Sequence, residues 1–129
     1  MTPYVRQWFD AFWFTQAVEV PIYVAALRRL RQRDRAAPDW LDRLPWQIAV
    51  AFAASLLTHP IVWFVIPHIP HQTYRQFIVR AEGFAWVAEA LWVAGIGGFR
   101  YGRALLVSLA ANAASAGLGE LCRYFIGWP

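Results

Sequence analysis

The sequence predicts an all-α protein: an up-and-down bundle of four helices embedded in a membrane, with both termini on the non-cytoplasmic side. Hydrophobic residues make up 59% of the 129 residues and charged residues 16%, whereas about 25% of residues are charged in a typical soluble domain. Four apolar stretches reach the length of about 20 residues that a helix needs to cross the hydrocarbon core. The basic side chains are all arginine and gather at the ends of these stretches.

The predicted spans belong to a single domain, residues 1–129, and cover residues 8–27, 44–66, 77–99 and 104–126. The first span ends at a dense run of arginines, and the second contains no formal charge. The third is interrupted by Arg80, Glu82 and Glu89. The fourth is rich in alanine, glycine and serine, which allow a neighbouring helix to approach closely.

The distribution of arginine predicts the orientation of the chain. Six arginines lie in the predicted loop 28–43, two lie between the third and fourth spans, and four lie on the opposite side. Because cytoplasmic loops carry an excess of positive charge, both termini are expected outside the cytoplasm. The expected location is multi-pass in the inner membrane of a bacterium. Since the N-terminus carries only Arg6 before the first apolar stretch, we expect that stretch to remain as a span and not to be cleaved as a signal peptide.

Polar residues inside each predicted span fall on one helical face. Ionisable residues are rare in membrane spans and usually face a protein interior or a water-filled cavity. If the four faces meet, the bundle has a polar interior that opens toward the non-cytoplasmic side. The faces consist of Thr15, Gln16, Glu19 and Tyr23; Ser55, Thr58 and His59; Glu82 and Glu89; and Ser108, Asn112, Ser115 and Gly119.

One interpretation of this interior is a metal site. His59, Glu19 and Glu89, with Glu82 as an alternative, would supply nitrogen and oxygen ligands to a divalent metal such as zinc or iron. No established zinc or di-iron sequence motif accompanies these residues.

A second interpretation is acid–base chemistry without a metal, on an apolar or lipidic substrate. Burial penalises the charged forms of carboxyl and imidazole groups, so Glu19, His59, Glu89 and Glu82 could transfer protons while Asn112 orients a substrate or a water molecule. A proton-coupled transporter, active as an oligomer, would use the same groups. Whether the protein is an enzyme stays open at this point.

A third interpretation is structural. The glutamates would bind polar groups of neighbouring helices and hold the bundle together. The chain could also be an accessory or assembly subunit, whose small-residue face on the fourth span contacts a larger membrane complex or a second copy. Membrane lipids are expected partners in every case. Nucleic acid is not, because membrane topology accounts for the arginines.

Overall fold

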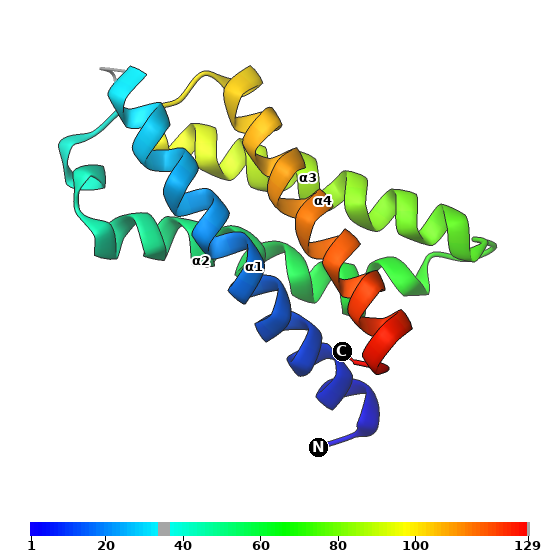
Figure 1. The fold of residues 1–129 in the computed structure, drawn as a ribbon. Helices are drawn as coiled ribbons and strands as arrows, with labels where there is room; N and C mark the ends of the chain where they lie inside the picture. The colour runs from blue at the N-terminus through cyan, green and yellow to red at the C-terminus, as the bar shows by residue number, and fades with distance from the viewer. Residues whose placement is uncertain (34–36, 129) are drawn as a thin grey trace.

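The computed structural model describes residues 1–33 and 37–128, and these fold into four long helices (Figure 1). The predicted all-α class is therefore confirmed. Arg35 of the predicted basic loop lies outside the described residues. The elements are α1 (Pro3–Arg33), the 3₁₀ helix η1 (Asp39–Asp42), α2 (Leu44–Phe64), the 3₁₀ helix η2 (Ile66–His68), α3 (Tyr74–Gly97) and α4 (Tyr101–Ile126).

Each long helix packs against its two neighbours in a closed order, with α1 on α2 and α4, and α3 on α2 and α4. Figure 1 shows α1 and α4 as one layer that crosses the layer formed by α2 and α3. The two layers approach each other near the connection between α1 and α2. They diverge toward the end of the molecule that holds both termini.

Helix α1 continues past Leu27, where the apolar stretch ends, to Arg33. Hydropathy marks where a chain is apolar, but arginine is a good helix former and lets the helix extend further. The last turns are then attached to the following loop, because Arg31 pairs with Asp39 at 2.8 Å and with Asp42 at 2.9 Å.

Both ends of α3 carry recognisable capping residues. Thr73 accepts a hydrogen bond from the Gln76 backbone, and the Gln76 side chain accepts one from the Thr73 backbone, which forms a capping box. At the other end, Gly98 has φ +65°, a left-handed conformation that favours glycine. The chain then turns back so that the ring of Phe99 covers Gly97, where an added Cβ would lie 2.3 Å from the ring.

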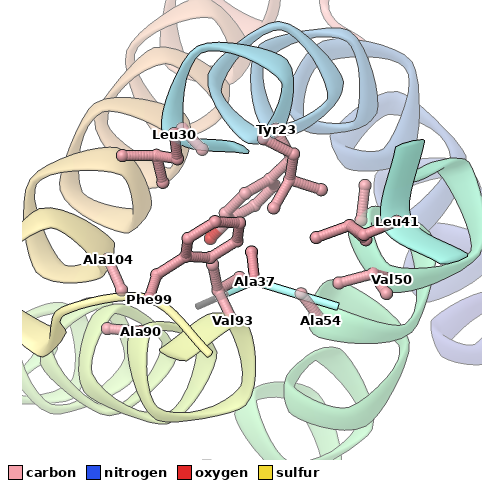
Figure 2. Packing of buried hydrophobic residues seen from close by; sticks show 13 residues of the cluster. Tyr23, Leu30, Ala37, Leu41, Val50, Ala54, Ala90, Val93, Phe99 and Ala104 are labelled. Atoms are coloured by element: carbon pink, nitrogen blue, oxygen red, sulfur yellow. The ribbon is translucent and has the colours of Figure 1, made fainter. Parts of the chain in front are cut away.

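The apolar core occupies the part of the bundle nearest the connection between α1 and α2. Figure 2 shows side chains from all four helices and from the connecting segments converging there. Tyr23 and Leu27 are fully buried in this core. Its other members are Leu30, Ala37, Leu41, Val50, Ala51, Ala54, Ala90, Val93, Phe99, Ala104 and Ala111.

The rest of the bundle has polar residues inside and apolar residues outside. Glu19, Glu89, Ser55, Ser108 and Asn112 are buried, whereas many leucines of α2, α3 and α4 are exposed. Two segments, Leu44–His68 and Tyr101–Ile126, are long and apolar enough to cross a membrane. Only 28% and 22% of their most apolar windows are buried, so most of this apolar surface faces outward.

The contact between Gly97 and Phe99 makes a testable prediction. We expect Gly97→Ala to lower the free energy of unfolding by about 1–3 kcal/mol, because the new methyl group must displace a buried ring. Gly95→Ala is the matched control in the same helix, since nothing lies within 4 Å of its added Cβ. That change should raise stability by up to about 1 kcal/mol, because alanine is the better helix former. Thermal unfolding of the two variants should therefore move in opposite directions, and equal shifts would contradict this packing.

Candidate functional site

The first part of the candidate site is the carboxyl group of Glu19, on the inward face of α1. The residue is only 1% exposed. Its Oε2 accepts a short hydrogen bond from the hydroxyl of Ser55 on α2. Its Oε1 accepts one from the hydroxyl of Ser115 on α4 at 2.5 Å. Glu19 therefore links α1 to both of the helices against which α1 packs.

The second part is the carboxyl group of Glu89 on α3, which is 2% exposed. Its Oε2 accepts hydrogen bonds from the hydroxyl of Tyr23 on α1 at 2.7 Å and from the amide of Asn112 on α4 at 2.8 Å. Its Oε1 accepts one from the hydroxyl of Thr58 on α2 at 2.8 Å. A single side chain of α3 thus contacts all three other helices.

We call Glu19, Glu89 and the five residues that donate to them the carboxyl network. The donors are neutral hydroxyl and amide groups, and each lies on a different helix from the carboxyl group to which it donates. A buried carboxyl group is costly unless hydrogen bonds replace its lost solvation. The network supplies that replacement, and as a consequence it holds the four helices in one arrangement.

His59 lies on α2, one helical turn after Ser55, and is 9% exposed. Aromatic rings surround it: Trp63 stacks at a centroid distance of 6.0 Å, Phe12 contacts it edge-on at 5.4 Å, and Trp8 lies at 6.4 Å. Its Nδ1 atom is buried and has no hydrogen-bond partner among the described residues. His59 is therefore beside the carboxyl network without being bonded to it.

A cavity of about 490 Å³ adjoins the network. Its polar lining includes Glu19, Thr58, His59, Asn112 and Ser115. The volume falls within the range of roughly 300–1,000 Å³ that is usual for small-molecule sites. The network is thus both an internal brace of the bundle and part of the wall of a cavity.

The cavity extends from the network toward the end of the bundle that holds both termini. Aromatic side chains such as Phe14, Trp63 and Phe77 line it along the way. Glu82, which is exposed, also lines it. Glu120 and Arg123 belong to the lining near the C-terminal end of α4, and they form an ion pair at 3.5 Å.

No match to this chain was found among protein-family models, curated proteins or solved structures. The network and the cavity are therefore the observations from which a function can be inferred.

The predicted metal ligands His59, Glu19 and Glu89 do not come together as a ligand set. Within residues 1–33 and 37–128, no group of three or more His, Cys, Asp or Glu side chains could hold a metal ion. Each of these groups has other partners in the bundle. Hydroxyl and amide donors engage the oxygens of both glutamates, while His59 packs among aromatic rings.

The other predicted site residues divide between two neighbouring places. Glu19, Glu89 and Asn112 belong to the carboxyl network, whereas His59 and Glu82 line the cavity without joining it. The predicted site omits four network donors: Tyr23, Ser55, Thr58 and Ser115. Helical spacing already places all four on the polar faces. Their position in the sequence could therefore have identified them as site residues, although their side chains are not ionisable in the usual range.

The network makes a prediction for Glu89. Glu89→Ala leaves three buried donors without an acceptor, and each such donor costs about 1–3 kcal/mol. Glu89→Gln should cost much less, since the amide keeps one acceptor oxygen and the Tyr23 and Thr58 hydroxyls can reorient to accept. Chemical unfolding of both variants would measure the difference.

The control for this prediction is Glu120→Ala, which removes an exposed carboxyl group whose ion pair is also exposed. We expect a change within about 0.5 kcal/mol, as for most surface substitutions. A Glu89→Ala variant no less stable than Glu120→Ala would show that the network does not hold the helices together.

Proposed function

We propose that this protein is a four-span membrane protein whose cavity binds a lipid-like small molecule, with the polar group of that molecule beside Glu19 and His59. The observation that carries the proposal is the cavity of about 490 Å³ whose inner lining contains buried polar groups inside an outwardly apolar bundle.

The reversed distribution of polar and apolar residues supports the membrane location. A soluble bundle buries leucine and exposes charge, but here Leu57, Leu91 and Leu106 are more than half exposed while Glu19 and Glu89 are buried. Segments Leu44–His68 and Tyr101–Ile126 have the length and hydropathy of spans. In a membrane α1 and α3, which pack between them, would complete a four-span bundle with its carboxyl groups shielded from lipid.

The position of the cavity supports access from the non-cytoplasmic side. Its outer lining includes Tyr4 near the N-terminus and Arg123 near the C-terminus, so it lies toward the end of the bundle that holds both termini. The arginine bias favours a non-cytoplasmic location for this end. In a bacterial inner membrane the cavity would then open away from the cytoplasm.

The chemistry of the lining supports binding of an amphiphilic molecule. Its aromatic and aliphatic part would contact an apolar tail, and Glu19, His59 and Asn112 would contact a polar group. Pockets with mostly apolar walls and a few convergent polar groups are typical of small-molecule sites. The same carboxyl and imidazole groups could exchange protons with the bound molecule, which keeps acid–base chemistry within this proposal.

A second candidate function is that of an accessory subunit. Ala110, Ala113 and Gly117 are exposed on the outer side of α4, and nothing lies within 4 Å of a Cβ added at Gly117. Small residues at such spacing permit close helix–helix packing in membranes. A second membrane protein could therefore pack on this face while the cavity stays free.

The membrane location predicts the effect of a charge on the outer surface. Leu57, in α2, is 52% exposed. Leu57→Arg should impair membrane insertion, because arginine near the centre of a span costs about 2.5–3.5 kcal/mol on insertion scales. Leu57→Ala is the control and should insert normally. The measurement is the fraction of protein that stays in alkali-washed membranes. A freely soluble Leu57→Arg variant with wild-type stability would contradict the proposal.

The binding role predicts that filling the cavity removes its ligand. Ala116 lines the cavity, whereas Ala113 lies on the exposed side of the same helix. We expect mass spectrometry of the purified protein to detect a bound amphiphile in the wild type and in Ala113→Trp, and to find it lost in Ala116→Trp. Equal amounts in all three samples would contradict binding in the cavity. Loss of a co-purifying protein from Ala113→Trp alone would favour the accessory subunit.

A further inference from the structure

The charged groups that line the cavity are predominantly acidic. Glu19 lies in its buried part, Glu82 along its side and Glu120 in its outer lining. The guanidinium of Arg123 also belongs to the lining but lies 3.5 Å from Glu120, so these two charges offset each other. The remaining carboxyl groups of the described lining belong to Glu19 and Glu82. A positively charged ligand beside them would favour their ionised form and bind to it.

The buried part of the cavity also offers hydrogen-bond acceptors. Each carboxyl oxygen of Glu19 accepts one hydrogen bond, although a carboxylate oxygen can accept two. His59, which is nine-tenths buried, lines the same cavity, and the structure gives its Nδ1 no partner among the residues it describes. In the tautomer that carries its proton on Nε2, His59 offers Nδ1 as an acceptor. A ligand that binds Glu19 and this tautomer of His59 must bring N–H or O–H donors, and an ammonium group brings up to three.

The walls of the cavity suit the same kind of ligand. Phe14, Trp63 and Phe77 line it, together with the ring of Tyr74. Aromatic faces attract organic cations through cation–π contacts, and the same rings provide apolar surface for a hydrocarbon tail. Carboxyl groups, free acceptors and aromatic rings thus favour one chemical class.

From these observations we propose that the ligand is a primary organic amine with an apolar tail, whose ammonium group lies near Glu19 and His59. This inference rests on the proposed binding role of the cavity and names the class of molecule that the cavity selects. Glu82 acts as the second acidic group on the way to the buried part.

The experiment compares three probes of equal chain length that differ only in the polar group: n-octylamine, n-octanol and n-octanoate. Isothermal titration into the full-length protein in phosphatidylcholine nanodiscs measures each dissociation constant, and empty nanodiscs serve as the blank. At neutral pH we expect n-octylamine to bind at least about tenfold more tightly than either of the other two, as one added charge-assisted contact would give.

Two variants test the residues that carry the inference. Glu82→Gln removes an exposed charge outside the carboxyl network and should weaken n-octylamine by up to about fivefold, the upper range for exposed charge pairs. It should leave n-octanol binding unchanged. Glu19→Gln should weaken n-octylamine further, with thermal unfolding as the check on its fold. Asp10→Asn, on α1 outside the cavity lining, removes the same charge and should change neither constant.

The outcomes separate this inference from the proposed function. Equal affinity for n-octylamine and n-octanol would overturn the amine inference while leaving the binding role intact, and so would a preference for n-octanoate. Equal losses of n-octylamine affinity in Asp10→Asn and Glu82→Gln would show that general surface charge causes the preference. That result would also overturn the amine inference. No binding of any probe would overturn both the inference and the binding role.

Discussion

A carboxyl group that leaves water loses solvation that apolar packing cannot replace, so its oxygens need hydrogen-bond donors at fixed positions. Glu19 and Glu89 impose this requirement twice within one small bundle. The donors of Glu19 come from α2 and α4, and those of Glu89 come from α1, α2 and α4. Each donor can reach its acceptor only if the helices keep their relative rotation and depth. In lipid, where the surroundings of a helix bundle are as apolar as its own leucines, such directional contacts are well suited to specify one arrangement.

The bundle has three zones along its length. The apolar core lies near the connection between α1 and α2, the carboxyl network follows, and the cavity extends toward the termini. Tyr23 joins the first two zones, since its ring is buried in the core while its hydroxyl donates to Glu89. Glu19 joins the second and third, since it belongs to the network and lines the cavity. The same polar groups therefore serve the fold and any ligand that enters.

The length of the apolar stretches was sufficient to predict the four helices, and helical spacing predicted the polar face of each one. Glu19 and Tyr23 are four residues apart, and Ser55 and His59 are also four apart, so each pair shares a face by the 3.6-residue repeat. Which donor meets which acceptor could not be predicted, because that depends on how far neighbouring helices shift along one another. His59 illustrates this limit. It lies one turn from Ser55, yet it packs among aromatic rings while Ser55 binds Glu19. Hydropathy did not predict the two ends of α1 either. The helix extends beyond the apolar stretch because its backbone hydrogen bonds continue through polar residues.

The pairing of donors with acceptors also bears on how a chain of this kind enters a membrane. Helices α1 and α3 carry the buried glutamates, whereas α2 and α4 lie in the two segments that are long and apolar enough to cross a membrane. Within the α1–α2 hairpin Ser55 already donates to Glu19, and within the α3–α4 hairpin Asn112 already donates to Glu89. In the membrane location that we propose, each hairpin could thus enter the bilayer as a unit, with the carboxyl group of one helix hydrogen-bonded by the other helix. The bonds of Ser115, Thr58 and Tyr23 then form when the two hairpins associate. Under this proposal, association of the two hairpins is a separate step that follows their insertion.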